Sequence, residues 1–585
     1  MLLMVNCDVR HAVALPYCYF NRYRGKVILR VLSGPEVEAV SVIYGDPFDF
    51  STGDRTWQST EIPMQQQYEG TSQCAWRVEF TAPRSRRLKY GFRVVMAGES
   101  YYFSENGVEP YTTAAVAAIH NHFFYPFIHR VDSPSVPEWA AQTVWYQIFP
   151  ERFCNGNPEI SPAGALDWET GTLGHRNFFG GDLRGIRNKL NYIKELGITG
   201  LYLTPIFQSP SPHKYDTEDY YTIDKHFGDT AELKALVSEA HRLGIRVMLD
   251  AVFNHAGSRH PFWQDVLQNQ EKSPYKDYFH IHHFPVQEKY PDSRNINFDT
   301  FSWTPLMPKW NTENPDLRRY LISAAQKWIR ECDIDGWRLD VANEVSFDFW
   351  REFSKEIRAV KDDFYIVGEI WDDASNWINS GYFDATMNYF LSSSISDLFL
   401  KKNTTPDQWT ERVLRVLERY SDLHNTVAFN LLDSHDTDRI LTRAGGDKQS
   451  VKNAFTMLFL LPGSPCIYYG TEIGMEGGHD PDCRRPMIWN EQKQDKVLLE
   501  FFKSLISFRS QQIQAINSGE IIYKGRIAGG AYCWILNQNA LSVLYSYDEP
   551  ADVSSSGRLL FSTGPVQNGR MPAHTIAVYS GKYVD

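Results

Sequence analysis

The middle of the chain alternates apolar, strand-like runs with amphipathic helical runs, and this alternation limits the fold more than any other feature of the sequence. Strands that alternate with helices form parallel sheets, and eight of them are the number that closes a barrel. We therefore predict an α/β fold with a (β/α)8 TIM barrel over residues 138–509. The strand-like runs lie at 144–150, 200–207, 246–253, 336–341, 364–370, 384–389, 426–432 and 465–469.

Helix signals accompany this pattern. A helix is expected after Asp229, because Glu232 follows three residues later as in a capping box, and Gly244 can take the left-handed conformation at the helix end. After the third strand the alternation stops for about 55 residues, until Asn314 and Pro315 open another helix. We interpret residues 256–312 as a subdomain inserted after strand 3.

The two ends of the chain carry strand-like runs without helical periodicity. Residues 1–125 contain short runs that are typical of a β-sandwich, and residues 510–585 are expected to form a second antiparallel β domain, also a sandwich. Two X-Pro pairs close to each other indicate a linker at 126–137.

Composition disfavours several classes of function. The formal net charge is −12 without any run of Lys or Arg, which argues against nucleic-acid binding. No window approaches about 18 uninterrupted apolar residues, and no positive charge precedes the short apolar start, so neither a membrane span nor an export signal is expected. The 8 Cys are scattered without a C-x-x-C pair, as is typical of reduced thiols. We expect a soluble, cytoplasmic protein.

Three carboxylates, Asp340, Glu369 and Asp436, each follow an apolar run, where a barrel places groups that reach a substrate. Retaining cleavage of a glycosidic bond needs a nucleophilic carboxylate and a second carboxyl group that donates and then accepts a proton. Asp340 suits the nucleophile, because Arg338 lies on the same strand face and is expected to keep it ionised. Glu369 has the more apolar setting, where loss of water favours the protonated form that a general acid needs.

The motifs around these residues resemble those of the alpha-amylase family of glycoside hydrolases. The resemblance spans most of the barrel and implies that Asp340 is the nucleophile, Glu369 the acid/base and Asp436 the transition-state stabiliser. In chain order the motifs are GITGLYLTPIF at 197–207, DAVFNH at 250–255, GWRLDVANE at 336–344, VGEIW at 367–371, NLLDSHD at 430–436 and GSPCIYYGTEIGM at 463–475.

The resemblance also implies substrate-binding residues. Tyr215 resembles the aromatic residue that stacks on the sugar at the cleavage point, and Trp371 resembles a contact on the acceptor side; core packing is the alternative for both. Glu344 resembles a position linked to water or acceptor handling, and a solvated loop glutamate is the alternative. The other substrate-binding candidates are His255, Arg338, His435, Asp480 and Arg484.

A narrower resemblance is to the cyclomaltodextrinase, neopullulanase and maltogenic amylase group, through VANE after Asp340, MPKWNTENP at 307–315 and DPDCRRPMIW at 480–489. It implies hydrolysis, with some transglycosylation, of α-1,4-glucosidic bonds in cyclodextrins, maltooligosaccharides and pullulan. It also implies a homodimer in which a carbohydrate-binding-like N-terminal domain covers the partner's active site. Trp310 stands where the group commonly has Leu, and is expected to alter a loop near the substrate.

The expected chemistry needs no cofactor, but several family members bind calcium through a similar loop. The corresponding residues are Asn155, Asn157, Gly180 and Asp182. Calcium needs oxygen ligands, and Ile160 stands where a further donor is expected, so a calcium site and its absence both stay open.

Two other functions are alternatives. One is a non-catalytic α-glucan-binding protein on the same fold, against which the retention of all three carboxylates argues. The other is a metal-dependent hydrolase that uses His255, His435 and Asp436, which the lack of an H-x-H pair at a strand end disfavours.

Overall fold

The computed structural model describes residues 8–53, 56–287, 289–290, 293–538, 540–553 and 557–581, and Cys7 lies outside them. The chain divides into two compact units. The barrel unit holds residues 136–401 and 427–511, and the flanking unit holds 1–135, 402–426 and 512–585. Within the described residues no helix is long and apolar enough to span a membrane, and the remaining seven cysteines are free.

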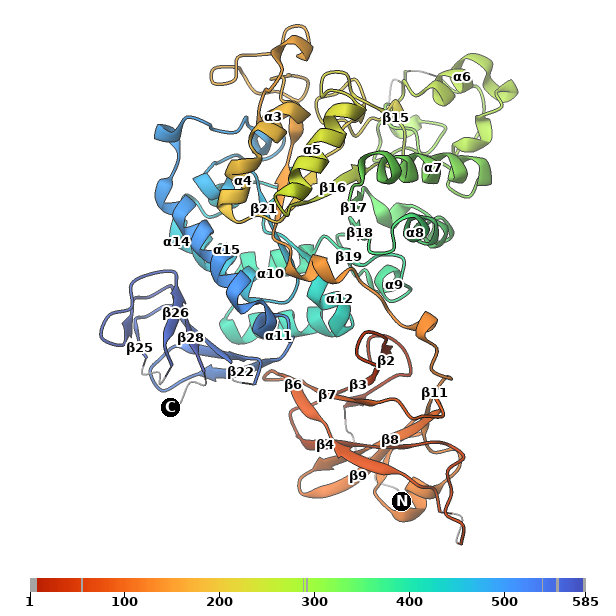
Figure 1. The fold of residues 1–585 in the computed structure, drawn as a ribbon, viewed down its shortest axis with the longest axis vertical. Helices are drawn as coiled ribbons and strands as arrows, with labels where there is room; N and C mark the ends of the chain where they lie inside the picture. Colours follow the sequence, from red (N-terminus) through yellow and green to blue (C-terminus); the bar gives the residue numbers. More distant parts are fainter. Residues whose placement is uncertain are drawn as a thin grey trace. The chain divides into compact units, whose positions relative to one another are not determined.

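The barrel unit is built on eight parallel strands, which confirms the predicted TIM barrel (Figure 1). Hydrogen bonds connect them in the order β19, β18, β17, β16, β13, β12, β21 and β20, and a parallel bridge between Met387 and Phe429 joins the two ends of this order. The strands are β12 (Trp145–Ile148), β13 (Gly200–Leu203), β16 (Arg246–Ala251), β17 (Gly336–Leu339), β18 (Tyr365–Gly368), β19 (Ala385–Thr386), β20 (Phe429–Asn430) and β21 (Ser464–Tyr468).

Some strands are shorter than the sequence predicts. β13 ends at Leu203 because the chain leaves the ring there, and Phe207 opens a separate hairpin of β14 (Phe207–Gln208) and β15 (Asp219–Ile223). β20 begins only at Phe429, since the residues before Ala428 form helix α12 (Asp422–Val427). An apolar run predicts burial at these positions, but burial alone does not separate a strand from an adjoining helix or loop.

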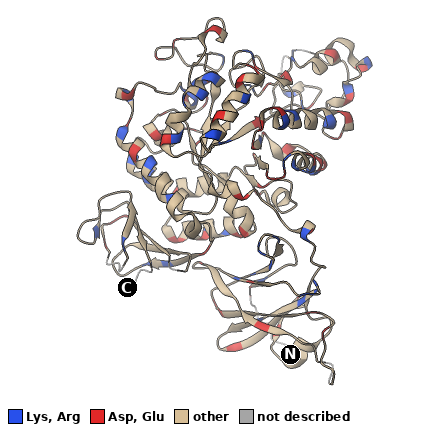
Figure 2. Ribbon diagram, in the orientation of Figure 1, with Lys and Arg blue, Asp and Glu red and all other residues tan. Residues whose placement is uncertain are grey.

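Helices pack around the ring, and their ends follow local signals. The Asp229 carboxylate accepts the Glu232 N–H at 2.9 Å, and Gly244 has a φ of 74°, as the sequence predicts. Residues 183–196 form two helices that are divided at Lys189. Acidic and basic residues are interspersed on α5 and α7, as expected of solvated faces (Figure 2). The barrel-unit helices are α2 (Pro150–Phe153), α3 (Leu183–Asn188), α4 (Leu190–Leu196), α5 (Thr230–Arg242), α6 (Pro261–Asn269), α7 (Pro315–Cys332), α8 (Phe347–Val360), α9 (Ser375–Ile378), α10 (Tyr389–Phe399), α13 (Ile440–Arg443) and α14 (Lys448–Leu460), together with most of α15 (Lys496–Ile516), which ends in the flanking unit.

The stretch 256–312 holds α6, short 3₁₀ turns and isolated bridges between β16 and α7. Trp310 lies in its core: the side chain is 1% exposed, stacks on Phe279 with ring centroids 4.6 Å apart, and donates to the Tyr220 hydroxyl at 3.0 Å. Trp310 therefore has a packing role in this stretch, and its expected effect on a loop near the substrate stays a prediction.

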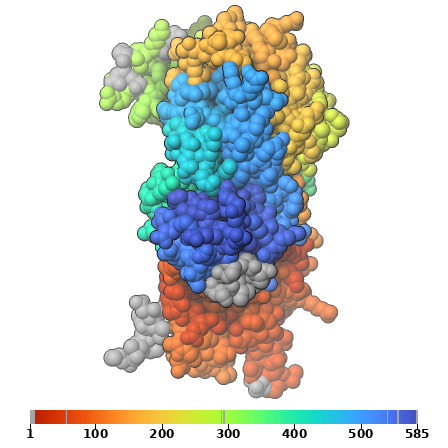
Figure 3. Space-filling view, turned by 90° about the vertical axis from the view of Figure 1, so that its left-hand side faces the viewer, coloured from red at the N-terminus to blue at the C-terminus, as the bar shows by residue number. Residues whose placement is uncertain are grey.

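The flanking unit contains two antiparallel β layers at the N-terminal end, and they share one apolar core. Leu29 from one sheet and Phe92 from the other both lie in this core, as a sandwich requires. The sheet that holds Leu29 continues into the C-terminal strands, because β6 pairs in parallel with β22 at Tyr68–Ile521 and Glu69–Ile522. Figure 3 shows the C-terminal strands (dark blue) against the N-terminal ones (red to orange). The strands are β1 (Val9–Arg10), β2 (Cys18–Asn21), β3 (Lys26–Ser33), β4 (Val37–Gly45), β5 (Thr60–Pro63), β6 (Gln65–Glu69), β7 (Cys74–Thr81), β8 (Leu88–Met96), β9 (Glu99–Ser104), β10 (Gly107–Pro110), β11 (Phe123–Tyr125), β22 (Ile521–Arg526), β23 (Tyr532–Leu536), β24 (Leu541–Ser546), β25 (Ala551–Asp552), β26 (Leu559–Ser562), β27 (Arg570–Met571) and β28 (Thr575–Ser580).

Residues 402–426, which the sequence places inside the barrel domain, belong to the flanking unit. They include α11 (Pro406–Glu418) and the start of α12, whose Asp422 forms ion pairs with Arg30 of β3 and Arg77 of β7. Gln67 also donates to Asp422 at 2.7 Å. Burial opposes the charge of Asp422, but the two guanidinium groups outweigh it and hold the pKa of this carboxyl well below its usual range.

Candidate active site

Arg338 of β17 is the centre of the site at the carboxyl ends of the strands. Its side chain is fully buried, and Nη1 donates to both oxygens of Asp250 at 2.9 and 3.0 Å and to Asp340 Oδ1 at 2.8 Å. Nη2 forms an ion pair with Glu369 Oε2 at 2.7 Å. Asp250 lies at the end of β16, Asp340 follows β17 and Glu369 follows β18, so three neighbouring strands deliver their acids to one guanidinium.

One positive charge therefore faces three carboxylates. Burial and the charges of Glu369 and Asp250 raise the pKa of Asp340 well above its usual range, although Arg338 opposes this shift. Burial likewise raises the pKa of Asp250 to about 6 against the effect of Arg338. The prediction that Arg338 keeps Asp340 ionised considers that pair alone, whereas in the structure the guanidinium is shared.

The apolar setting predicted for Glu369 is wrong. Besides the ion pair with Arg338, Oε2 accepts the backbone N–H of Val341 at 3.0 Å, and Oε1 accepts the indole N–H of Trp371 at 3.0 Å. Val341 has a φ of 45°, a left-handed conformation that is rare for a β-branched residue. Strained backbone of this kind concentrates at functional sites, and here it presents an N–H to a carboxylate beside Asp340.

Asp436 belongs to a second group beyond β20. Arg484 reaches it with Nη2 at 3.2 Å from Oδ1, and reaches Asp480 with Nη1 at 3.2 Å. His435 Nε2 lies 3.1 Å from Asp436 Oδ2. Burial raises the pKa of Asp436 despite the opposing charge of Arg484. The structure thus gathers three other predicted site residues around this third carboxylate.

Tyr215 joins the two groups. Gln147 Nε2 donates to His435 Nδ1 at 2.7 Å, so that His435 Nε2 carries the proton and donates to the Tyr215 hydroxyl at 2.6 Å. The Tyr215 hydroxyl in turn donates to Asp250 Oδ2 at 3.0 Å. Burial holds the pKa of His435 well below its usual range, which keeps the ring neutral as this chain of donors requires.

His255 supports the loop that carries Tyr215. Its Nε2 lies 3.2 Å from the Tyr215 carbonyl oxygen, and its ring stacks on Phe301 with centroids 5.0 Å apart. Burial lowers the pKa of His255 to about 3, so the ring is neutral. Glu344 is held differently: Lys309 Nζ lies 2.7 Å from Glu344 Oε2 and donates to Asn254 Oδ1 at 2.7 Å. Glu344 is nevertheless exposed, with 42% of its side chain accessible, so it is a solvated glutamate that also pairs with a lysine.

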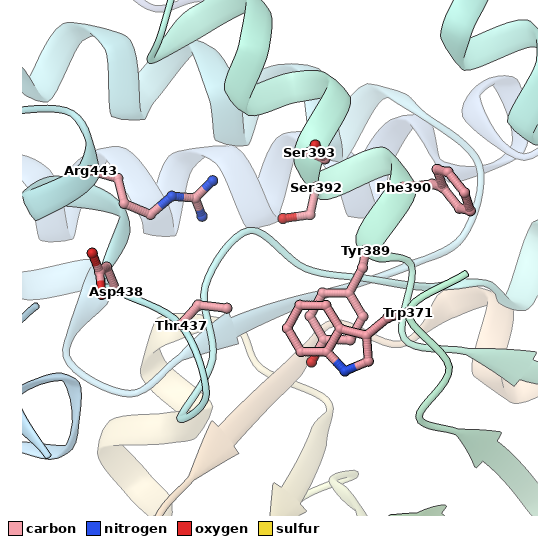
Figure 4. A pocket seen from close by; sticks show the side chains of 8 residues that line it. All are labelled: Trp371, Tyr389, Phe390, Ser392, Ser393, Thr437, Asp438 and Arg443. Carbon is pink, nitrogen blue, oxygen red and sulfur yellow. The ribbon is translucent and has the colours of Figure 1, made fainter. Parts of the chain in front are cut away.

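Trp371 faces an open cavity of about 480 Å³ beside the acid (Figure 4). Its indole is 48% exposed and lies parallel to the Tyr389 ring, with centroids 3.6 Å apart and an angle of 3° between the planes. Core packing is therefore excluded for Trp371. Tyr389, which the sequence analysis did not identify, covers one face of the indole and leaves the other face open. The other residues that line the cavity are Phe390, Ser392, Ser393, Thr437, Asp438 and Arg443.

The loop expected to bind calcium fits a cation only in part. Asn155 Oδ1 is buried without a hydrogen-bond partner in the described part of the chain, which suits a cation ligand. The Asp182 carboxylate, however, already accepts the N–H groups of Gly156, Asn157 and Gly185 and serves as the N-cap of α3. Gly180 approaches this loop closely, since a Cβ there would lie 2.6 Å from Ser161 Oγ. Calcium needs about 6 to 8 oxygen ligands, and the backbone donors already occupy part of the Asp182 carboxylate, so a calcium site and its absence both stay predictions.

Comparisons with known proteins agree with this arrangement. The family model described as "Alpha amylase, catalytic domain" matches residues 147–519, and "Alpha amylase, N-terminal ig-like domain" matches residues 4–129. A cyclomaltodextrinase of Geobacillus thermopakistaniensis (strain MAS1) is 49% identical over 83% of this chain and 81% of its own. An intracellular maltogenic amylase of Bacillus subtilis is 45% identical over 85% of this chain and 84% of its own. A solved cyclomaltodextrinase structure superposes with a TM-score of 0.86 at 37% identity, covering 98% of this chain and 99% of that one.

Proposed function

The chain belongs to the alpha-amylase family of glycoside hydrolases, and on this premise we propose that it cleaves α-1,4-glucosidic bonds of cyclodextrins, maltooligosaccharides and pullulan with retention, accompanied by some transglycosylation. One observation carries the proposal: Asp340 and Glu369 converge on Arg338, while Glu369 also contacts an exposed indole at a cavity. An acid beside both a nucleophile and an exposed aromatic face suits hydrolysis of a bond between two sugar rings.

The reaction proceeds in two displacements. Asp340 attacks the anomeric carbon while Glu369 transfers its proton to the glycosidic oxygen, so that the leaving sugar departs with a hydroxyl group and a glycosyl ester remains on Asp340. Glu369, now a carboxylate, takes a proton from water or from an acceptor hydroxyl, and the resulting oxygen nucleophile displaces Asp340. Asp436 stabilises the positive charge that develops on the sugar ring in both steps.

The two sugar rings that flank the cleaved bond are bound by different residues. Tyr215, His435, Asp480 and Arg484 face the ring that forms the ester, and the packing of Tyr215 among charged groups keeps its position fixed. His255 acts on the same side through the Tyr215 carbonyl. Trp371 takes the leaving or accepting ring on its exposed face. Acceptor sugars therefore compete with water at one aromatic surface, which accounts for transglycosylation.

The assembly and location are proposed by analogy with the relatives. We propose a homodimer that acts in the cytoplasm on small α-glucans, with the N-terminal β domain narrowing the partner's cleft against intact starch. The name of the Bacillus subtilis relative, an intracellular enzyme, supports the location. Analytical ultracentrifugation tests the dimer: a monomer at working concentration with full activity on β-cyclodextrin would overturn this arrangement.

The reaction itself needs no metal, because its acid, its nucleophile and its stabilising carboxylate come from side chains. We propose that any calcium at the Asn155 loop is structural. Exhaustive chelation is then expected to leave the rate of the folded protein unchanged, and a loss of turnover with an unchanged circular dichroism spectrum would contradict the proposed chemistry.

Initial rates on β-cyclodextrin, pullulan and soluble starch test the proposed function. We expect faster turnover of the cyclic substrate than of starch, and panose as the product from pullulan, because an α-1,4 bond is cleaved. Maltotriose from pullulan would assign α-1,6 cleavage instead, and the absence of any reducing sugar would return the non-catalytic alternative.

A further inference from the structure

Lys309, in the stretch inserted after β16, extends its side chain toward the residues behind the active site. Its Nζ donates to Asn254 Oδ1 at 2.7 Å and lies 2.7 Å from Glu344 Oε2. The backbone is held separately, because the Trp310 N–H donates to the Asn254 carbonyl at 3.0 Å. The Lys309 N–H also donates to the Asp299 carbonyl at 2.9 Å. A substitution of Lys309 therefore removes the ammonium group and keeps these backbone hydrogen bonds.

The Lys309 ammonium determines which way the Asn254 amide faces. An ammonium group carries donors and no acceptor, so the amide atom beside it is the oxygen. The amide nitrogen then faces the next side chain, and Asn254 Nδ2 lies 3.2 Å from His255 Nδ1. Asn254 and His255 are both 1% exposed, so water does not compete for these contacts.

The orientation of the amide fixes the tautomer of His255. Because Asn254 Nδ2 donates to His255 Nδ1, the proton of the neutral ring lies on Nε2. Nε2 donates to the Tyr215 carbonyl oxygen at 3.2 Å. With the amide reversed, Nδ1 would carry the proton and Nε2 would turn a lone pair toward the carbonyl oxygen, so this hydrogen bond would be lost.

The backbone at Tyr215 depends on contacts of this kind. Lys214, the residue before it, has a φ of 66°, and a left-handed conformation at a residue other than glycine persists only where the surrounding structure holds it. The Tyr215 hydroxyl donates to Asp250 at 3.0 Å and accepts from His435 at 2.6 Å. A shift of this backbone therefore displaces a ring that contacts both groups of the active site.

We propose that Lys309 is a positioning residue for Tyr215. Its ammonium group orients the Asn254 amide, which sets the tautomer of His255 and thereby holds the Tyr215 backbone. The expected effect on turnover rests on the proposed function, whereas the sequence of hydrogen bonds concerns the protein alone. The contact of Lys309 with Glu344 offers a different way to affect the reaction, and the experiments separate the two.

Lys309→Met is the first test, because methionine has a similar length and no donor. With a chromogenic maltooligosaccharide we expect kcat to fall by about 10- to 100-fold, as for a misplaced group in an active site. KM should change less, because sugar contacts away from the cleaved bond remain. Hydrogen–deuterium exchange should become faster in the peptide that holds residues 213–217. Lys276→Met, at an exposed lysine of the same inserted stretch that pairs with Asp277 at 2.8 Å, is the matched control and should change neither measurement.

Returning an ammonium group should restore the activity. Lys309→Cys that is aminoethylated on its thiol has a side chain of lysine length with a donor-only end, and we expect it to recover most of kcat. Lys309→Gln carries an acceptor as well as donors, so it should stay impaired. Wild-type protein taken through the same alkylation controls for the native thiols, of which Cys154 is partly exposed.

Double-mutant cycles separate the two contacts of the ammonium group. In an Asn254→Ala background Lys309→Met should cost little more, because the sequence of hydrogen bonds is already interrupted. In a Glu344→Gln background the full loss in kcat should remain. A loss that disappears with Glu344→Gln and persists with Asn254→Ala would overturn the proposal and assign the effect to Glu344.

Two further results would also overturn the positioning role. One is an unchanged kcat and unchanged exchange at residues 213–217 in Lys309→Met, and the other is a fully aminoethylated Lys309→Cys protein that stays impaired. Failure of the proposed function has a different signature. Wild-type protein would then release no reducing sugar from any glucan, while the exchange of this peptide would still become faster in Lys309→Met.

Discussion

Removing the charge of Asp250 should move the acid limb of the pH–rate profile. Asp340 must be ionised to attack, so kcat/KM falls as the pH drops through its raised pKa. Asp250 Oδ1 and Asp340 Oδ1 both accept from Arg338 Nη1, so these two oxygens are at most about 5.7 Å apart. At that distance and an effective dielectric constant of about 20, two unit charges repel by about 3 kcal/mol, or about 2 pH units.

The pKa of Asp250 is itself raised to about 6, so this group is fully charged only at a pH well above 6. We therefore expect Asp250→Asn to shift the limb to lower pH by less than this full value of about 2 units. The measurement is kcat/KM for a chromogenic maltooligosaccharide at constant ionic strength, because this parameter reports the free enzyme. The substitution also disturbs the hydrogen bonds that Asp250 accepts from Tyr202 and Tyr215, and this is expected to lower the rate at every pH. The test therefore uses the pH at which the acid limb lies and not the absolute rate.

Asp335→Asn is the matched control. Asp335 is another fully buried carboxylate, but it precedes β17 whereas Asp340 follows it, so about 16 Å of strand separates them. Its replacement should leave the limb where it is in the wild-type protein. The electrostatic reasoning fails if Asp250→Asn leaves the limb unmoved or shifts it to higher pH, or if the control shifts it equally.

Other substitutions test the roles of single groups. Asp340→Asn should abolish turnover with an unchanged circular dichroism spectrum, because the change is nearly isosteric; near-normal activity would refute its role as nucleophile. Glu369→Gln should cost least on substrates with good leaving groups, which need little protonation, and an equal loss on all substrates would count against the acid role. Trp371→Phe keeps the ring over Tyr389 but removes the N–H to Glu369, so its transfer products should fall less than those of Trp371→Ala; the reverse order in chromatography would contradict an aromatic acceptor surface. Asp422→Ala should destabilise the flanking unit by about 3 to 5 kcal/mol, because it leaves the buried Arg30 and the partly buried Arg77 without their shared carboxylate. The pKa of Asp422 is lowered by folding, so its stabilisation is present above about pH 4 and lost as the pH falls further, and a Tm equal to wild type at neutral pH would exclude this effect.

The barrel could be predicted because its signals are local. Apolar runs of strand length, the Asp229 cap and the glycine at 244 each report on a few neighbouring residues, and all three recur in the structure. Pairing across long separations carries no such signal. The β6–β22 contact and the ion pairs of Asp422 with Arg30 and Arg77 depend on residues hundreds of positions apart, so the two β ends look independent in the sequence.

The acids of the site were predictable, but their environments were not. Each acid follows an apolar run, and this pattern can be read directly from the sequence. The sharing of Arg338 among Asp250, Asp340 and Glu369 cannot, because it arises only when three strands lie side by side. The left-handed Val341 has no sequence signal, because a valine predicts extended backbone. Tyr389 could have been found, since it opens a helix after a barrel strand, where substrate contacts concentrate.

The parallel pairing of β6 with β22 has a consequence during synthesis. Tyr68 and its partner Ile521 are 453 residues apart in the chain. At about 5 to 20 residues per second a ribosome needs roughly 20 to 90 s to cover that distance. Through that interval the outer edge of β6 has no strand beside it, and an open edge is a template for association with other chains. The C-terminal strand β22, which is synthesised late, therefore covers the open edge of the N-terminal strand β6.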